Sequence, residues 1–364
     1  MSETKKTLRV GIVGCGGIAN GKHMPSLKKI EEVQMVAFCD IVKDRAEKAA
    51  KEYGVEGAKV YTDYKEMINT EKLDVVHVCT PNKSHAPISI YALENDCHVM
   101  CEKPMAKTYA DAKAMLEAYK KSGKKLTIGY QNRCTSEAQY VHACCENGEL
   151  GEIYYAKANA LRRRAVPTWG VFLNEDEQGG GPLIDIGTHA LDLTLWCMDN
   201  YKVKSVKGSV FKKLGDQKNT ANAWGDWDPK EYTVEDSAFG FITMENGATI
   251  VLESSWAINM LDCSEANCVL CGTKAGADWR DGVRINYVKN NRQCVEKPAM
   301  GAGGVAFYDG KSESAADIDA RQWINAILND TEPLVKPEQA IVVTRILEAI
   351  YESAKTGKEI VFND

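Results

Sequence analysis

The sequence predicts a doubly wound α/β domain with a parallel sheet, followed by an α+β domain with a mainly antiparallel sheet. Over the first 129 residues, short apolar strands alternate with helical segments, which is typical of parallel sheets with right-handed crossovers. Beyond about residue 150 the apolar residues recur with period two, as in antiparallel strands that pack one face on helices. The length of 364 residues exceeds that of most single domains. We therefore expect domains over residues 1–129 and 130–364.

The composition argues against several classes of protein. Charged residues make up 26% of the chain and hydrophobic residues 44%, as in ordinary globular proteins. The net charge of -6 argues against a nucleic-acid partner. No apolar run approaches the roughly 18 residues of a membrane helix, and Met1–Lys6 leads directly into a strand without a signal-peptide core. We expect a cytoplasmic protein with neither nucleic acid nor membrane as a partner.

The chain contains thirteen cysteines. In the absence of a signal peptide we expect reduced thiols that serve as small core hydrophobes. Cys268 and Cys271 form a C-x-x-C pair, but a zinc site needs a second pair at matching spacing, and this pair lies in a strand-like run. We expect no metal site.

A glycine motif follows the first predicted strand, Leu8–Val13. Residues 14–19 read Gly-Cys-Gly-Gly-Ile-Ala and fit the pattern G-x-G-x-x-A. In this pattern the first glycine makes the turn, the second lets the backbone approach a pyrophosphate, and the last small residue allows close helix packing. The motif predicts a dinucleotide site formed by Gly14, Gly16, Gly17 and Ile18.

An acidic residue, Asp40, ends the second predicted strand, Val33–Cys39. A carboxylate here can accept hydrogen bonds from both ribose hydroxyls and would repel a 2′-phosphate. Asp40 therefore favours NAD over NADP, although Lys43 and Arg45 close by weaken the preference. The alternative is a solvated acid that merely ends a strand.

Polar groups also follow two further predicted strands, and such strand ends share the sheet edge that binds ligands. Lys103 directly precedes a proline, which restricts it to extended conformations, so we expect it to face the cofactor crevice rather than to be an ordinary surface charge. The groups are Thr80, Pro81, Asn82 and His85 after the fourth strand and Glu102 and Lys103 after the fifth.

A polar stripe lies on the otherwise apolar segment Gly179–Leu193. Pro182 suits the first helical position, and Asp185, His189 and Asp192 share one helical face by their spacing. Buried groups of this kind need partners. The stripe is either a catalytic group or a core histidine paired with one of the two aspartates.

The second half offers further candidates for substrate contact. Asn132 and Arg133 follow a last parallel strand, so we expect them to face the same crevice, and we expect Trp169 to line the substrate site. For Arg162 and Arg164, a solvated edge or ion pairs are favoured over substrate contact. Trp224 and Trp227 lie in the long polar stretch Lys213–Tyr232, where they either cap a sugar or pin the loop.

The predicted strands of the second domain are Ile153–Arg162, Val203–Phe211, Val234–Thr243, Ala248–Ser255 and Ala266–Gly272, and two amphipathic helices follow, about Asp317–Asn329 and Pro337–Lys355. We expect these helices to pack beneath the sheet or between the domains.

With these motifs in this order, nearly the whole chain resembles the glucose–fructose oxidoreductase/inositol dehydrogenase/rhizopine-catabolism (Gfo/Idh/MocA) family. The resemblance implies a Rossmann domain that binds NAD and a large open-faced, mostly antiparallel sheet that carries the substrate site. It implies Lys103, Asp185 and His189 as the catalytic group and a cis bond before Pro104. Its substrates would be a polyol, sugar, glycoside or cyclitol.

In the mechanism that we expect, His189 is the general base, Asp185 orients it, and Lys103 stabilises the developing alkoxide; the opposite assignment, with Lys103 as the acid–base group, stays open. The run Arg-x-x-x-Pro-x-Trp-Gly that ends at Gly170 resembles gut-bacterial branches that oxidise C3 of glucosides. Two alternatives are an NAD-containing glycosidase that oxidises C3 transiently, and a non-catalytic cofactor-sensing regulator, against which the three retained catalytic residues argue.

We also expect self-association. Large apolar residues such as Tyr155, Phe239, Phe241 and Val251 are distributed over both faces of the second sheet by the alternation, and the chain has too few helices to cover both faces. An uncovered apolar face predicts a homo-oligomer. The family resemblance likewise implies a dimer, tetramer or larger assembly through this sheet.

Overall fold

The computed structural model describes residues 6–218, 221–300 and 313–363, which form two compact units. The first unit contains the described residues up to Gln131 together with Glu313–Ile341, and the second contains those from Asn132 to 300 and from Val342 onward. The first crossing of the chain lies within two residues of the expected boundary. The return of Glu313–Ile341 to the first unit was not predicted.

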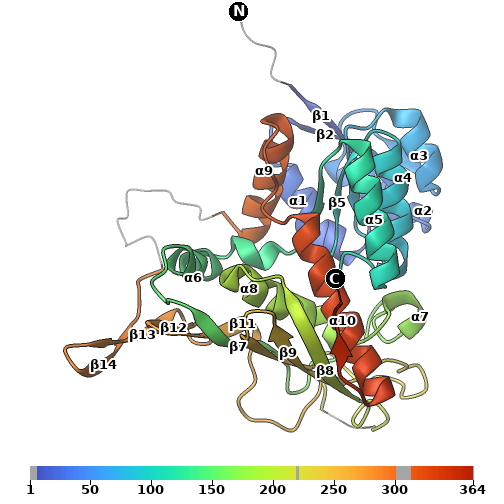
Figure 1. Ribbon diagram of the computed structural model, residues 1–364. Helices are drawn as coiled ribbons and strands as arrows, with labels where there is room; N and C mark the ends of the chain where they lie inside the picture. The colour runs from blue at the N-terminus through green and yellow to red at the C-terminus, as the bar shows by residue number, and fades with distance from the viewer. Residues whose placement is uncertain (1–5, 219–220, 301–312, 364) are drawn as a thin grey trace, which may run out of the picture. The chain divides into compact units, whose positions relative to one another are not determined.

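The first unit contains a six-stranded parallel sheet with strand order β3-β2-β1-β4-β5-β6, which confirms the predicted doubly wound fold (Figure 1). Its strands are β1 (Leu8–Val13), β2 (Val33–Cys39), β3 (Lys59–Tyr61), β4 (Val75–Val78), β5 (His98–Cys101) and β6 (Leu126–Ile128). Its helices are η1 (Ala19–His23), α1 (Met24–Leu27), α2 (Lys43–Tyr53), α3 (Tyr64–Glu71), η2 (Asn82–Ser84), α4 (His85–Glu94), α5 (Tyr109–Ser122) and α9 (Ala315–Leu328).

Side-chain caps mark where several of these helices begin. The side chain of Asp63 accepts a hydrogen bond from the backbone N–H of Lys65 at the start of α3. At the start of α5, the side chain of Thr108 accepts one from the backbone N–H of Asp111. Ser314 forms a capping box with Asp317 at α9. These caps satisfy N–H groups that a helix leaves unpaired at its amino end.

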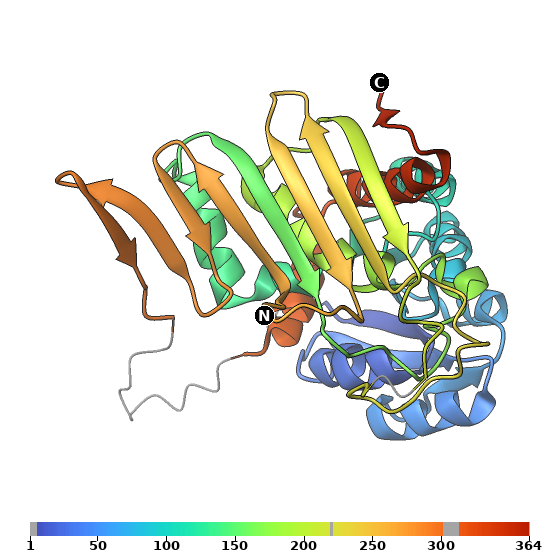
Figure 2. The same ribbon diagram turned by 90° about the horizontal axis from the view of Figure 1, so that it is seen from below.

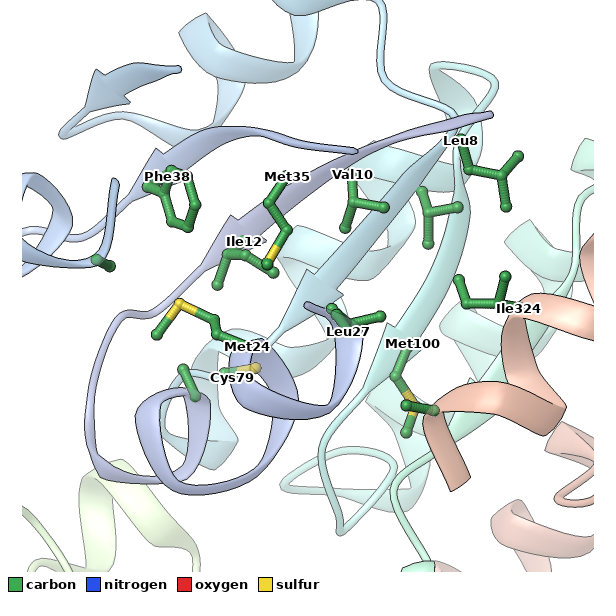
Figure 3. Packing of buried hydrophobic residues seen from close by; sticks show 14 of the residues in the cluster. Leu8, Val10, Ile12, Met24, Leu27, Met35, Phe38, Cys79, Met100 and Ile324 are labelled. Carbon is green, nitrogen blue, oxygen red and sulfur yellow. The ribbon is translucent and has the colours of Figure 1, made fainter. Parts of the chain in front are cut away.

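The apolar core of the first unit includes a helix from the far end of the chain (Figure 3). Leu8, Val10 and Ile12 of β1 and Phe38 of β2 are buried together with residues of α1. The α9 residues that join them are Ala320, Trp323, Ile324 and Ile327. Their spacing of three and four places them on one face of the helix. The helix is therefore predicted correctly, and its apolar face packs into the core of the first unit.

The second unit contains a nine-stranded sheet with strand order β14-β13-β12-β11-β7-β10-β9-β8-β15 (Figure 2). Among the described strands of this second sheet, only the pair β7–β10 is parallel, so the predicted mostly antiparallel sheet is confirmed. The strands are β7 (Ile153–Leu161), β8 (Val203–Phe211), β9 (Ser237–Met244), β10 (Thr249–Ser255), β11 (Glu265–Gly272), β12 (Ala275–Asp278), β13 (Arg284–Lys289), β14 (Arg292–Glu296) and β15 (Ile360–Val361). The helical segments are η3 (Gln131–Cys134), which begins in the first unit, α6 (Ser136–Glu146), α7 (Glu175–Gln178), η4 (Leu183–Gly187), α8 (Thr188–Met198) and α10 (Pro337–Thr356), which belongs to this unit from Val342 onward.

Strands β12 to β15 were not predicted. β12 reads Ala-Gly-Ala-Asp, which lacks the β-branched and aromatic residues that indicate a strand. The hairpin between β13 and β14 does carry a local signal, because Asn290 and Asn291 both have positive φ, at 50° and 55°. Two central residues with positive φ are the requirement of a type I′ turn.

Helices cover one face of the second sheet. α8 packs on β7 and β11, where Ala156 and Ala158 are buried. α10 approaches β8 and β9 so closely that a Cβ on Gly208 would lie 2.6 Å from the backbone oxygen of Ile350, and one on Gly240 would lie 2.6 Å from its Cδ1. Small residues in the strands are therefore what admits the helices.

The opposite face carries the large apolar side chains. Strand register places Val251 beside Phe241, and the alternation puts Tyr155 and Phe239 on the same face. These four residues thus share one face, which corrects our expectation that they divide between both.

Within the described residues, no helix is long and apolar enough to cross a membrane.

Candidate active site

The glycine loop after β1 has the geometry that the motif predicts. Gly14 has a φ of +89°, and a Cβ there would lie 2.6 Å from the carbonyl oxygen of Cys79. Only glycine fits this position. A Cβ on Gly16 or Gly17 would meet no atom within 4 Å. The backbone of this loop is therefore open to an approaching group, which fits the pyrophosphate of a dinucleotide.

Asp40 holds the glycine loop in place. One carboxylate oxygen accepts a hydrogen bond from the backbone N–H of Cys15 at 2.9 Å, and the other accepts one from Val42 at 2.8 Å. The side chain is buried, so Asp40 is not the solvated acid of the alternative. Its contact with a ribose stays a prediction. Ile18 in the loop and Ile41 beside Asp40 are both exposed.

His85 connects two of the predicted loops. Its Nδ1 lies 2.8 Å from the carbonyl oxygen of Pro104 and its Nε2 lies 2.9 Å from that of Thr80. The imidazole is buried and both nitrogens lie against backbone oxygens, so His85 fixes these two loops; its direct contact with a cofactor stays a prediction. Burial lowers the pKa of His85. Thr80 Oγ1 is buried and has no hydrogen-bond partner within the described residues, which suits a ligand contact.

Glu102 is the centre of a buried polar network. Its Oε1 lies 3.0 Å from Lys22 Nζ and 2.7 Å from His23 Nε2. Lys22 Nζ also lies 3.3 Å from Asp319 of α9, and His23 Nδ1 lies 3.0 Å from His77 Nδ1. We expected Glu102 to bind cofactor; its carboxylate is instead buried against these partners. Lys22, His77 and Asp319 escaped the sequence analysis because no motif marks them.

Opposite charges dominate this network. Burial alone would raise the pKa of Glu102, but the charges of Lys22 and Lys103 and the hydrogen bond from His23 hold it well below its usual range. Burial alone would lower the pKa of Lys22, but Glu102 and Asp319 raise it. Glu102 is therefore an anion directly before Lys103, whose backbone N–H donates to Glu102 Oε2 at 3.2 Å.

Lys103 lies at the carboxyl end of β5. Its side chain is half-buried, and the Lys103–Pro104 peptide bond is cis, as the family resemblance implies. The loops that begin at Gly14 after β1, at Thr80 after β4 and at Lys103 after β5 follow three neighbouring parallel strands. The first unit therefore gathers the predicted cofactor loops, with half-buried Asn82 and exposed Pro81, at one sheet edge.

The second unit contains the other two candidate catalytic residues. From Gly181 to Cys197, along η4 and α8, all residues are buried except Asp185 and His189, which are half-buried. The aspartate and the histidine are thus the only two side chains of this segment that are partly exposed to solvent. The predicted stripe stops there, because Asp192 is 1% exposed.

Asp185 is anchored by two residues that directly follow strands, Trp256 after β10 and Arg162 after β7. Its Oδ2 accepts a hydrogen bond of 3.1 Å from Nε1 of the buried Trp256 and lies 4.0 Å from Nη1 of Arg162. Arg162 itself forms a bidentate ion pair with Glu265, with both contacts at 2.5 Å. The ion pair confirms the preference for ion pairing over substrate contact at Arg162.

Two of the three glycines before η4 have a steric cause. A Cβ on Gly180 would overlap the hydroxyl of Tyr351, and one on Gly181 would overlap the backbone oxygen of Glu235. The carboxylate of Glu235 accepts hydrogen bonds from the backbone N–H groups of Gly181 at 2.8 Å and Leu183 at 3.1 Å, and from the Tyr351 hydroxyl at 2.8 Å. Burial raises the pKa of Glu235. This carboxyl group satisfies N–H groups at the amino end of the segment that carries Asp185.

Arg133 corrects another prediction. Its guanidinium is 0% exposed and donates to Asp192 from Nε at 2.9 Å and from Nη2 at 2.6 Å. The ring of Trp196 lies 5.4 Å from the guanidinium carbon. We expected Arg133 to contact substrate, but it is a buried core group. Asp192 is the partner of Arg133 and not, as the alternative had it, a partner of a core histidine.

The remaining predictions divide by exposure. Asn132 is half-buried, Trp169 is 53% exposed and Trp224 is 43% exposed. Trp227 is buried and donates from Nε1 to the carbonyl oxygen of Gly215 at 2.9 Å, so it pins the long loop. All thirteen cysteines are free thiols, and most are buried. Among the described residues there is no group of three or more side chains that could hold a metal ion.

Comparison with known proteins matches both units to one family. Residues 8–130 match the model of an oxidoreductase family with an NAD-binding Rossmann fold, and residues 138–278 match the GFO/IDH/MocA C-terminal domain.

Two curated relatives and one solved structure illustrate the similarity. A D-glucoside 3-dehydrogenase of Escherichia coli is 37% identical over 361 residues, which is 98% of each chain. An inositol 2-dehydrogenase of Salmonella typhimurium is 31% identical over 202 residues, which is 55% of this chain and 57% of the relative. The structure of a levoglucosan dehydrogenase with NADH and levoglucosan superimposes with a TM-score of 0.82 at 21% identity, covering 98% of this chain and 99% of that one.

Proposed function

Because the chain belongs to the Gfo/Idh/MocA oxidoreductase family, we propose that this NAD-dependent enzyme of sugar hydroxyl groups oxidises the C3 hydroxyl of a glucoside to a ketone. The identity of 37% over 98% of the chain to a D-glucoside 3-dehydrogenase supports this substrate over a free polyol or a cyclitol. The observation that carries the proposal is the half-buried pair Asp185 and His189 on an otherwise buried segment.

The residues at the edge of the first sheet fit NAD. The open backbone at Gly16 and Gly17 would hold the pyrophosphate, Asp40 would accept from the ribose, and the buried hydroxyl of Thr80 would gain a partner. Bound NAD supplies a hydride acceptor, so the protein must handle the hydroxyl proton and the charge on oxygen.

His189 would remove the hydroxyl proton as general base. Asp185, fixed by Trp256 and lying beside Arg162, would orient the imidazole and stabilise its cation. Lys103 would donate a hydrogen bond to the substrate oxygen and stabilise the developing alkoxide.

A panel of methyl glycosides and free polyols tests the proposal. We expect NADH to form with methyl glucoside, and NMR of the product should show a ketone at C3. A ketone at another carbon would show that the enzyme oxidises a different hydroxyl group and would contradict the assignment to C3. Release of methanol without net NADH would instead identify the glycosidase alternative, and the absence of both reactions with every compound would favour the regulator.

Variants test the catalytic group. Lys103→Ala and His189→Ala should each lower kcat by a factor of about 10² or more while NAD binding, measured by fluorescence titration, persists. Lys120→Ala, an exposed lysine of α5, is the matched control and should leave kcat unchanged. Near-wild-type turnover in either active-site variant would rule out the assigned role.

We further propose that the sheet face opposite α8 and α10 mediates homo-oligomerisation. Tyr155, Val251, Phe239 and Phe241 share this face, and Phe241 is among the exposed large hydrophobic residues. A patch of this kind is typical of an interface, and a two-fold contact between identical faces would bury it.

The thirteen free thiols support a reducing compartment such as the cytoplasm.

A further inference from the structure

Two tryptophans stand exposed beside each other on the second unit. Trp169 and Trp224 have ring centroids 5.0 Å apart with an interplanar angle of 69°, and they are 53% and 43% exposed. Large aromatic surfaces left in water forgo the stabilisation that burial would give them. We propose that this tryptophan pair binds a neutral six-membered ring carried as the aglycone of the glucoside, an inference that rests on the proposed function and extends it to a second subsite.

The backbone beneath the tryptophan pair is fixed in advance. Asn222 accepts a hydrogen bond from the N–H of Val166 at 2.8 Å and donates to the oxygens of Val166 at 3.0 Å and Gly225 at 2.8 Å. The hydroxyl of Thr168 donates to the carbonyl oxygen of Trp224 at 2.7 Å. Two segments more than fifty residues apart are thus joined directly under both indoles. Such rigidity lowers the conformational entropy that these segments of the protein lose when a ligand binds.

Pinning the loop does not require Trp224. Trp227, three positions further on, is buried, makes a hydrogen bond of 2.9 Å to Gly215, and packs against Tyr232 with ring centroids 5.7 Å apart. The loop therefore has one tryptophan for its own attachment and a second that remains exposed. This division between Trp227 and Trp224 favours a ligand contact for the exposed indole.

Contacts connect the tryptophan pair to Asp185 by two routes. The guanidinium of Arg162 lies 5.1 Å from the ring of Trp224 and 4.0 Å from the carboxylate of Asp185. The second route runs through aromatic contacts: the ring centroid of Phe172 lies 6.0 Å from that of Trp169 and 6.4 Å from that of Trp256.

The second route also ends at the carboxylate, since Trp256 donates its hydrogen bond to Asp185. A single guanidinium group therefore separates the proposed catalytic carboxylate from the exposed indoles. A sugar ring oxidised beside Asp185 would have a ring-bearing aglycone within reach of the tryptophan pair.

The ion pair of Arg162 favours a neutral ligand. The positive charge of Arg162 is already neutralised by its bidentate partner Glu265, so it offers little to a phosphate or carboxylate. The indoles present apolar surface, which suits an aryl ring or the C–H face of a second pyranose. Both carry the same chemistry, a flat neutral ring attached at the anomeric oxygen.

Three glucosides of one anomeric configuration test the proposal: methyl glucoside, phenyl glucoside and a glucose disaccharide. The measured quantity is the preference, defined as the kcat/KM of a ring-bearing glucoside divided by that of methyl glucoside. Trp224→Ala and Trp169→Ala should each lower the preference three- to tenfold, about the worth of one aromatic contact. The change should appear mainly in KM, since the contact forms equally in the ground and transition states.

Two further variants serve as controls. Trp224→Phe keeps an aromatic face and should retain most of the preference, whereas Tyr154→Ala removes an exposed aromatic ring outside the pair and should leave the preference unchanged. Loss of preference for phenyl glucoside alone would identify an aryl subsite, and loss for the disaccharide alone would identify a sugar subsite. An unchanged preference for both in a folded Trp224→Ala protein overturns the proposal.

The proposal can fail separately from the proposed function. If no glucoside is oxidised, the proposed function fails, and calorimetric titration of phenyl glucoside into the NADH-loaded protein still tests the tryptophan pair. Binding that is weakened three- to tenfold by Trp224→Ala supports the subsite. Equal binding by wild type and variant, or none by either, refutes it.

Discussion

Replacing Asp192 by alanine would leave the guanidinium of Arg133 in the core of the second unit without its counter-charge. Both side chains are buried, at 0% and 1% exposure, and the variant loses two charge-assisted hydrogen bonds of 2.6 and 2.9 Å. Removing one partner of a buried pair of this kind costs about 3–5 kcal/mol. Because whole domains are stable by only about 5–15 kcal/mol, Asp192→Ala should lower the urea midpoint of the second unit strongly.

The double variant Arg133→Met, Asp192→Leu is the matched control. It removes both charges and replaces them with apolar groups, which is often neutral or stabilising for a buried pair. Urea denaturation followed by tryptophan fluorescence measures each free energy of unfolding. A loss below about 1 kcal/mol in Asp192→Ala, or a double variant as unstable as the single one, would refute the reasoning.

The same variants decide between the two roles considered for Arg133. If Arg133 is only a core group, the double variant should recover kcat/KM together with stability. Recovery of stability without recovery of kcat/KM would reinstate the substrate contact expected from the sequence.

The single variant Arg133→Met should depend on pH with a definite sign. Burial raises the pKa of Asp192 above its ordinary value of 3.8, and Arg133 opposes that rise. Without Arg133 the folded pKa rises further above the unfolded one. The contribution of Asp192 to the free energy of unfolding is then fully present below its unfolded pKa and is lost as pH rises through its folded pKa. The loss of stability caused by Arg133→Met should therefore grow with pH. The loss caused by Asp192→Ala should not follow this dependence, because that variant has no carboxylate at position 192 to titrate.

Three further predictions concern the cofactor, the buried network and assembly. Asp40→Ala should narrow the preference for NAD over NADP in a fluorescence titration, and tighter binding of NADP by the wild type would contradict our reading of Asp40. Lys22→Met should destabilise the first unit by about 3 kcal/mol or more at neutral pH and by less in acid, because the uncompensated Glu102 can then take up a proton; an equal loss at both pH values would contradict this. Phe241→Lys should lower the mass measured by light scattering, and a wild type with the mass of one chain would remove the case for an oligomer.

The sequence predicts what depends on local spacing. The glycine turn at Gly14, the cis bond before Pro104 that the resemblance implies, and the pair Asp185 and His189 follow from short motifs, and the structure has the turn, the cis bond and the two half-buried residues where they were expected. Strand periodicity likewise locates β8 to its first and last residue. These features need no knowledge of distant partners.

Predictions failed where a polar residue beside a motif has a partner far along the chain. Glu102 looks like a ligand group until Lys22, eighty residues earlier, is seen to pair with it. The substrate contact predicted for Arg133 failed for the same reason, because its partner Asp192 lies 59 residues further along the chain. A single sequence does not show which distant charges meet, so a buried ion pair and a ligand contact look alike.

The position of α9 has a consequence for biosynthesis. Ala320, Trp323, Ile324 and Ile327 complete the first unit's core, yet a ribosome makes them only after nearly the whole second unit. The nascent Rossmann sheet must therefore wait, with part of its apolar surface uncovered, while about 180 residues of the other unit emerge. At roughly 5–20 residues per second this interval lasts on the order of ten seconds or more, during which the unfinished sheet is a natural client for a chaperone.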